Sequence, residues 1–212
     1  MEARITFIIP SVGRISLRDT IASLQMQTHP YWKAIVAFDN VDPPENLITN
    51  DPRVTYVRRP KMEGEEQHHR AGAMRNFAIE HADTEWVAFV DDDDTLHAEY
   101  IDMFLSHVRD VPQAQCVVFR MIGCDHTPMP LPLPESRTIR HSEVGISYAM
   151  KRTLYGEGYR FPLLGTSEDF ALLNTILQNG KKMVLSPYIA YFIRQQPYPN
   201  RVKVNDRLDT LN

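Results

Sequence analysis

The chain has 212 residues, a formal net charge of −4 at pH 7 and 43% hydrophobic residues. This length and apolar content predict one domain with a sizeable core, and the near-balanced charge excludes the strongly basic composition typical of nucleic-acid-binding proteins. The two cysteines, Cys116 and Cys124, fit no metal motif and indicate a reducing compartment.

The N-terminus, Met1-Glu2-Ala3-Arg4, leads directly into an apolar run, and the sequence has no stretch of about 18 apolar residues. We therefore expect no signal peptide and no transmembrane segment. These features indicate a cytoplasmic location, with at most a peripheral attachment to a membrane.

The first half of the chain predicts alternating strands and helices. Strands are expected at 5–10, 33–39, 53–58 and 86–90, and helices from residue 16, at 71–82 and at 97–109. The strands are continuous apolar runs, which are typical of parallel strands buried on both faces. We therefore predict an α/β fold whose mostly parallel sheet is covered by helices on both faces.

The second half is less regular. Prolines alternate with other residues from Thr127 to Pro134, which predicts an extended loop over the sheet. After this loop we expect a helix at 168–178 and strands near 145–150, 182–185 and 189–194. The residues from Asn200 onward are polar, and we expect them to be loosely held.

Four consecutive aspartates, Asp91 to Asp94, follow the apolar run Trp86–Val90. They lie where a buried strand leaves the core, the position at which open α/β sheets bind ligands. At about 6 Å and an effective dielectric of about 20, two such charges repel by roughly 3 kcal/mol. A divalent cation with oxygen ligands would offset this repulsion. The alternative is a solvated acidic turn that caps the next helix.

Several other motifs accompany the aspartates in a fixed order: Ile8 to Arg14, Ser23 to Thr28, Ile35 to Asn40, Arg75-Asn76 with Ala78, and Ser167 to Leu172. Together they resemble the motifs of the family 2 glycosyltransferases, over most of the chain from Ile5 to about Arg194. The resemblance implies a small, non-processive enzyme with a single GT-A-like domain and a Rossmann-like sheet. It implies a nucleotide-sugar-binding half (about 1–121), an acceptor-binding half (about 122–194) and a C-terminal tail (195–212).

The chain departs from the family pattern at three places. Gly13 stands where the family often has Asn, and Phe38 and Asn40 replace an Asp and a Gly, so that only Asp39 remains of an acidic pair. The Gln-x-x-Arg-Trp motif of processive members is absent, which argues against repeated sugar addition.

The activity that the resemblance implies is the metal-dependent, inverting transfer of one sugar from a nucleoside diphosphate sugar to a hydroxyl of a glycan or glycoconjugate. A UDP-sugar is favoured, with TDP- and GDP-sugars left open. Asp93, helped by Asp91, would hold Mn²⁺ or Mg²⁺ on the diphosphate and stabilise the leaving group. Asp169 would deprotonate the acceptor hydroxyl, and Glu168 would orient the acceptor.

The resemblance assigns the other donor contacts as follows. Asp39 would recognise the base, beside Pro10, Ser11 and Val12. Arg75 would bind the phosphate or brace the base, since guanidinium groups bind phosphate in a bidentate manner. Arg14, Asp92 and Arg194 would complete the donor site.

Some assignments stay open. His68, His69 and Arg70 form a basic segment that either contacts the diphosphate or is solvated. A phosphatase of the haloacid dehalogenase type would use Asp91 and Asp93, but that fold usually begins with the strand before these residues. A non-catalytic nucleotide-sugar-binding module would retain Asp39 and Asp93 without a need for Asp169.

Overall fold

The computed structural model describes residues 3–60, 70–123, 129–163, 167–193, 202–203 and 209–211. The strands are β1 (Ile5–Ser11), β2 (Trp32–Asp39), β3 (Val54–Arg59), β4 (Trp86–Phe89), β5 (Thr95–Leu96), β6 (Cys116–Ile122), β7 (Tyr148–Lys151), β8 (Met183–Phe192), β9 (Val202–Lys203) and β10 (Asp209–Leu211). The helices are α1 (Leu17–Gln25), α2 (Ala71–Ile79), α3 (Tyr100–Asp110), α4 (Arg152–Gly156) and α5 (Glu168–Gln178), with a short 3₁₀ turn, η1 (Glu45–Leu47).

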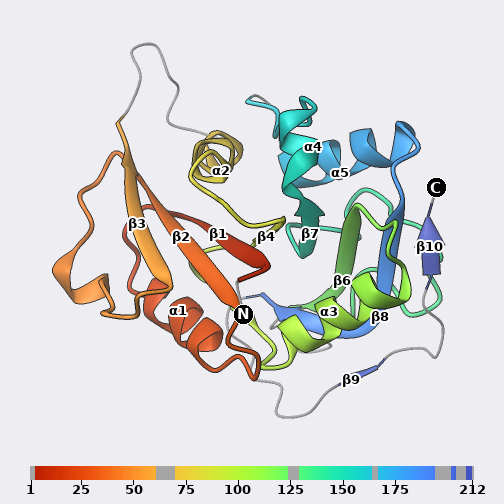
Figure 1. The fold of residues 1–212 in the computed structure, drawn as a ribbon, viewed down its shortest axis with the longest axis horizontal. Coiled ribbons are helices and arrows are strands. Elements are labelled where there is room, and N and C mark those ends of the chain that lie inside the picture. Colours follow the sequence, from red (N-terminus) through yellow and green to blue (C-terminus); the bar gives the residue numbers. More distant parts are fainter. Residues whose placement is uncertain are drawn as a thin grey trace.

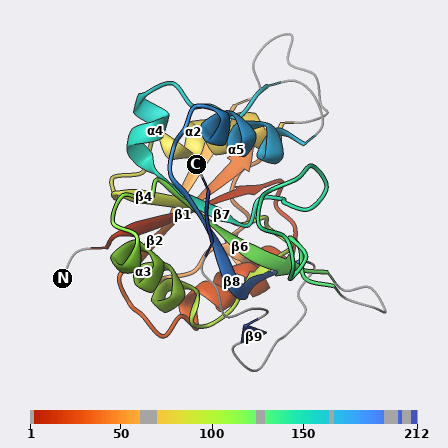
Figure 2. The ribbon, with the colours of Figure 1, turned by 90° about the vertical axis from the view of Figure 1, so that its right-hand side faces the viewer.

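These elements form three layers, with α1 and α3 on one face of the sheet and α2, α4 and α5 on the other (Figures 1 and 2). The strand order is β10-β8-β6-β7-β4-β1-β2-β3, and β5 and β9 also pair with β8. Neighbours β4, β1, β2 and β3 are parallel. The predicted α/β fold, with helices on both faces of its sheet, is confirmed.

The apolar runs explain why this sheet forms. The side chains of β1, β2 and β4 are almost all fully buried, as continuous hydrophobic strands between two helical layers must be. Each of the strands and helices predicted in the first half is present, with ends displaced by a few residues. The predicted helix at 97–109 begins only at Tyr100, because β5 pairs with β8 and the His97 N–H still donates to the Ala190 carbonyl oxygen of β8 at 3.0 Å.

The second half differs from the prediction in its strands. The segments expected at 182–185 and 189–194 are one strand, β8, although Ser186 and Pro187 lie in its middle. The parallel pairing of β6 with β8 jumps from Val118–Leu185 to Arg120–Ile189, so extra residues of β8 are absorbed there. An irregularity of this kind accommodates a proline, which has no N–H to donate.

The two described parts of the C-terminal segment are strands, β9 and β10, which differs from the loosely held tail expected there. β10 pairs antiparallel with β8, from Asp209 opposite Leu185 to Leu211 opposite Met183. The Asp209 side chain is buried and forms an ion pair with Arg137 at 3.2 Å. The sequence around β10 is polar, and its composition does not indicate that it pairs with β8, whose paired residues, Met183 to Leu185, lie well before it in the chain.

The described part of the proline-rich segment, from residue 129, is an extended loop that lies beside β6. Leu131 pairs with Met121 of β6 through both backbone hydrogen bonds. Arg120 is fully buried beneath it, and its Nη1 donates to the carbonyl oxygens of Pro132 and Leu133. None of the helices in the described part of the chain has the length and apolar character needed to span a bilayer.

Candidate functional site

Three adjacent parallel strands end at one edge of the sheet. In the register, Ser11 at the end of β1 lies beside Phe38 of β2, and Ile8 lies beside Phe89, the last residue of β4. Asp39 ends β2, and Asp91 follows β4 by two residues. A cavity of about 370 Å³ opens at this edge, which is where open α/β sheets bind their ligands.

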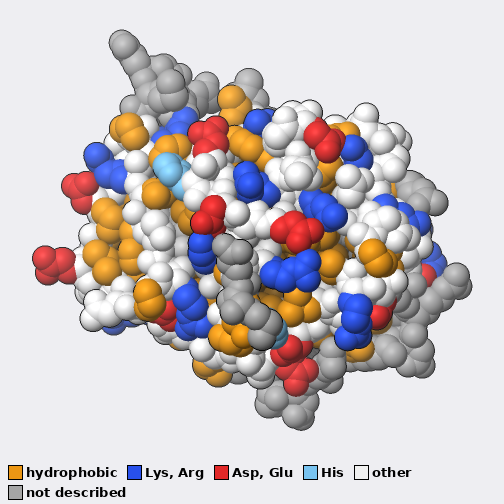
Figure 3. Space-filling view, viewed as in Figure 1, with side chains coloured by type: hydrophobic (Ala, Val, Ile, Leu, Met, Phe, Trp, Pro, Cys, Tyr) orange, Lys and Arg blue, Asp and Glu red, His pale blue; other side chains and the backbone are white. Residues whose placement is uncertain are grey.

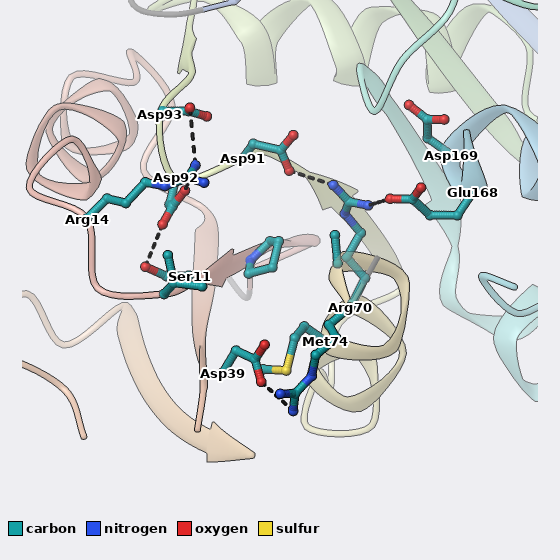
Figure 4. Close-up of a pocket in the computed structure, with 14 residues that line it drawn as sticks. Ser11, Arg14, Asp39, Arg70, Met74, Asp91, Asp92, Asp93, Glu168 and Asp169 are labelled. Atoms are coloured by element: carbon teal, nitrogen blue, oxygen red, sulfur yellow. Dashed lines mark hydrogen bonds and ion pairs between the residues drawn. The ribbon is translucent and has the colours of Figure 1, made fainter. Parts of the chain in front are cut away.

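The cavity collects nearly all of the predicted site residues. It is lined by Pro10, Ser11, Val12, Arg14, Asp39, Arg75, Asp91, Asp92, Asp93, Glu168 and Asp169, and also by Arg70, Ala71 and Met74. Figure 4 shows three groups of side chains around it: Asp39 near Arg70 and Met74, Arg14 near the aspartates, and Glu168 beside Asp169. Arg194, His68 and His69 lie outside the described residues.

Asp39 and Arg70 form one end of the cavity. The Asp39 Oδ1 and the Arg70 Nη2 are 2.6 Å apart, and the side chains are only 12% and 11% exposed. Arg70 directly precedes α2, which brings it back over the end of β2. The sequence left Arg70 undecided between a ligand contact and a solvated position, because its partner lies 31 residues earlier in the chain.

The aspartate turn is held by polar contacts from β1 and the loop after it. Ser11 Oγ donates to Asp92 Oδ2 at 2.7 Å. Arg14 Nη1 donates to Asp92 at 3.1 Å and to Asp93 at 3.2 Å. Burial raises the pKa of Asp92, and the Ser11 hydrogen bond and Arg14 oppose that shift.

A second set of contacts fixes the far side of the turn. Tyr191, on β8, donates its hydroxyl hydrogen to Asp94 Oδ2 at 2.6 Å and accepts the N–H of Asp91 at 3.2 Å. Thr20 Oγ1 donates to the carbonyl oxygen of Asp94 at 2.7 Å. Asp94 is 5% exposed and does not line the cavity, so it braces the turn from behind.

Arg75 joins the aspartate turn to α5. Its guanidinium donates to Asp91 at 2.6 Å and to Glu168 at 2.8 Å, and the side chain is only 4% exposed. Burial alone would lower the pKa of Arg75, but the two carboxylates hold it above its ordinary value. Arg75 thus lies between the two groups of carboxylates, away from the ion pair of Asp39.

The rest of α2 clamps the segment that leads to α5. Asn76 Nδ2 donates to the carbonyl oxygen of Phe161 at 2.8 Å, and Asn76 Oδ1 accepts the Phe161 N–H at 3.0 Å. A Cβ atom on Gly72 would lie 2.9 Å from the carbonyl oxygen of Pro162 and 3.1 Å from Glu168 Cγ. Only glycine allows this close approach, which places Glu168 beside Arg75.

Glu168 and Asp169 begin α5 after a turn with unusual backbone geometry. Ser167 has φ +66°, a left-handed conformation uncommon for a non-glycine residue. Asp169 Oδ1 accepts the backbone N–H of Phe170 at 2.7 Å. Burial nevertheless raises the pKa of Asp169, and the charges of Glu168 and Asp91 add to the shift. A buried carboxylate with a raised pKa is a better proton acceptor than an exposed one.

The charge of the cavity lining is unbalanced. Six carboxylates face three guanidinium groups, a formal excess of three negative charges. An anionic ligand would be repelled unless a cation came with it. No group of three or more metal-ligating side chains converges within the described residues. Two carboxylates, with further oxygens from a bound phosphate and water, are nevertheless how Mg²⁺ is usually held, so the residues present fit such an ion.

Comparisons with known proteins identify a family and one curated relative. The family model "Glycosyl transferase family 2" matches residues 6–164. A putative teichuronic acid biosynthesis glycosyltransferase, TuaG, of Bacillus subtilis (strain 168) is 25% identical over 190 residues, 83% of this chain and 73% of that protein.

Solved structures share the fold. S. aureus TarS (residues 1–349) superposes with a TM-score of 0.71 at 16% identity, over 90% of this chain and 60% of that one. The complex of TarS with UDP-GlcNAc gives 0.70 over 92% and 59%. A mannosyltransferase from Pyrobaculum calidifontis, PcManGT, solved with GDP-Man and Mn²⁺, gives 0.64 at 18% identity over 94% and 59%. The chain therefore spans about 60% of the length of these structures.

Proposed function

The chain belongs to glycosyl transferase family 2, and from this premise we propose that it transfers one sugar from a nucleoside diphosphate sugar to a hydroxyl group of a glycan or glycoconjugate. A UDP-sugar is the favoured donor, a divalent metal ion is required, and the anomeric configuration is inverted. The observation that carries the proposal is the single cavity in which carboxylates from β2, the turn after β4 and α5 converge.

The two ends of the cavity suit the two ends of a donor. Asp39 can accept the imide N–H of a uracil ring, with Arg70 beside it as a donor to the ring oxygens. Pro10, Ser11 and Val12 line the wall between this pair and the aspartate turn. The diphosphate would then lie over Asp91 to Asp93, and the sugar would point toward α5.

The negative charge of the lining is the reason for including a metal. A dianionic diphosphate would not enter a cavity with three excess negative charges unless a divalent cation accompanied it. Asp93 and Asp91 would hold the ion, which would supply charge stabilisation for the departing diphosphate. Mn²⁺ and Mg²⁺ both suit these ligands.

Asp169 is the proposed base. The acceptor oxygen forms a bond to the anomeric carbon while the bond between that carbon and the diphosphate oxygen breaks, and the acceptor proton passes to the Asp169 carboxylate. Attack from the face opposite the leaving group inverts the configuration. Glu168 would orient the acceptor. Its hydrogen bond from Arg75 also fixes the start of α5 relative to the aspartate turn.

The related structures support a nucleotide-sugar donor and leave its base open, because one was solved with UDP-GlcNAc and another with GDP-Man and Mn²⁺. The family match favours glycosyl transfer over the phosphatase alternative. The strand before the aspartates is also not the first of the sheet, since β1, β2 and β3 precede it in the chain.

A donor-hydrolysis assay tests the proposal. The protein is incubated with UDP-, TDP- and GDP-hexoses and Mn²⁺, and release of the nucleoside diphosphate is followed with and without EDTA and candidate acceptors. We expect release from one donor, stimulated by an acceptor and abolished by EDTA. Release that persists in EDTA would contradict metal dependence, and nucleotide binding without turnover of any donor would favour a non-catalytic module.

A further inference from the structure

The aspartates that line the cavity differ in how firmly they are held. Asp91 is bound by buried Arg75, and Asp92 is 4% exposed and bound by Ser11. Asp93 is 39% exposed at its side chain, and its partner among the described residues is Arg14. Asp93 is therefore the carboxylate of this turn that can most readily change partners.

Arg14 itself is held only weakly. Its side chain is 55% exposed, and it lies in the loop between β1 and α1, where Val12 and Ile15 are also exposed. Within the described residues its guanidinium contacts are made through Nη1 alone, which leaves the rest of the fork available to another anion. An exposed ion pair of this kind contributes at most about 1 kcal/mol, so it exchanges readily.

We propose that Arg14 is an internal counter-cation for Asp93, which it releases when a divalent metal and a diphosphate bind together. This inference rests on the proposed function, because it assigns Asp93 to the metal and the cavity to a nucleotide. Asp92 would keep its hydrogen bond from Ser11 after Arg14 leaves, so the turn would not lose its shape.

Competition follows from the position of the guanidinium. A cation on Asp93 would meet the positive charge of Arg14 at the same carboxylate, so Arg14 weakens metal binding in the absence of a donor. A diphosphate offers Arg14 other oxygens, to which a guanidinium binds strongly. Metal and nucleotide would therefore each strengthen the binding of the other, and the coupling is reciprocal.

Removing Arg14 changes the affinity for the metal in opposite directions under this role and under a purely structural one. If Arg14 only braced the turn, removing it would loosen Asp93 and weaken metal binding. If Arg14 competes with the metal, removing it strengthens metal binding without nucleotide and weakens the gain that nucleotide provides.

The experiment measures Mn²⁺ binding by the electron paramagnetic resonance signal of free Mn²⁺, first without nucleotide and then with UDP. The variants are Arg14→Gln and Arg14→Lys. Arg18→Gln is the matched control, because Arg18 is one helical turn further and its Nε binds the Asn46 carbonyl oxygen away from the aspartates. Circular dichroism verifies that each variant is folded.

We expect Arg14→Gln to bind Mn²⁺ alone about three- to fivefold more tightly than the unmodified protein, as loss of one exposed ion pair allows. UDP should then improve its Mn²⁺ affinity less than it does in the unmodified protein. Arg14→Lys and Arg18→Gln should both resemble the unmodified protein without nucleotide. Equal or weaker Mn²⁺ binding by Arg14→Gln would overturn the inference. Absence of Mn²⁺ and UDP binding in the unmodified protein would instead overturn the proposed function, and the inference with it.

Discussion

At the scale of single residues, the site depends on carboxylates in different environments. Asp93 is partly exposed beside the exposed Arg14, Asp39 is paired with Arg70, and Asp169 is half-buried at the start of α5. Burial favours the protonated form of a carboxyl group. The different environments of Asp93 and Asp169 therefore suit one to bind a metal and the other to accept a proton in the same cavity.

The pH dependence of transfer follows from Asp169. Its pKa is raised above the ordinary value of 3.8, mainly by burial, and the residue accepts a proton only when it is ionised. Activity should therefore fall as the pH drops through a value above 3.8 and should be fully present above it. A pH profile of kcat/KM measures this, and an acidic limb at or below 3.8 would contradict the assignment.

Asp169→Asn should lower kcat by about 10²–10⁴-fold, the usual contribution of a general base, while nucleotide and Mn²⁺ affinity stay unchanged. Initial rates with saturating donor and acceptor measure the loss. Asp110→Asn, an exposed change at the end of α3, is the control and should retain full activity. Near-complete activity in Asp169→Asn would remove Asp169 from the mechanism.

Base recognition is tested by Asp39→Asn. The change removes the carboxylate that would accept the base N–H and leaves Arg70 without this counter-ion, so UDP affinity should fall by about tenfold or more. Calorimetric titration with UDP and Mn²⁺ gives the affinity. Asp42→Asn is the control, because Asp42 is three residues away and its side chain is 88% exposed. This variant should bind UDP as the unmodified protein does. Equal affinity in both variants would place the base elsewhere.

At the scale of elements, α2 and β8 assemble the site from segments far apart in the chain. The order of apolar runs and motifs in the sequence predicted α2 and α5 and placed Asp39 and Asp91 at strand ends and Asp169 at a helix start. That these residues share one site was implied by the resemblance to the family. The sequence did not predict Glu168 as a partner of Arg75, because Glu168 lies 93 residues further along the chain. Nor did it predict the contact of Tyr191 with the aspartate turn, because Tyr191 lies 100 residues after Asp91.

The close packing of α2 is tested by Gly72→Ala. The added methyl group would meet the Pro162 carbonyl oxygen at 2.9 Å, so we expect the change to destabilise the protein by about 1–3 kcal/mol. Urea unfolding measures it. Gly156→Ala, in α4, has no atom within 4 Å of the new Cβ and should be neutral or slightly stabilising. Equal free energies of unfolding for the two variants would contradict the close contact of Gly72 with the segment before α5.

The brace from β8 is tested by Tyr191→Phe, which keeps the ring and removes the hydroxyl that joins Asp94 to the Asp91 N–H. Hydrogen bonds to charged groups contribute about 1.5–3 kcal/mol, so we expect lower stability together with weaker Mn²⁺–UDP binding. Tyr188→Phe on the same strand is the control, because the Tyr188 ring stacks on His107 of α3 and its backbone pairs with Lys203 of β9. Unchanged Mn²⁺–UDP binding in Tyr191→Phe would show that the brace does not support the site.

At the scale of the whole molecule, the cavity is a place where negative charge is locally in excess. On the face seen in Figure 3, acidic and basic side chains are interspersed. The cavity instead carries twice as many carboxylates as guanidinium groups, at the edge where β1, β2 and β4 end. We therefore expect a nucleotide to bind there together with a divalent metal.

A thermal-shift panel of UDP, GDP, TDP and CDP, each with and without Mn²⁺, tests this claim most directly. A ligand at about 100 times its dissociation constant adds about 2.7 kcal/mol to the free energy of unfolding, which is readily detected. We expect stabilisation by one nucleotide, UDP being favoured, only in the presence of Mn²⁺, and we expect it to be lost in Asp93→Ala. Equal stabilisation without metal, or no shift with any nucleotide, would contradict this expectation.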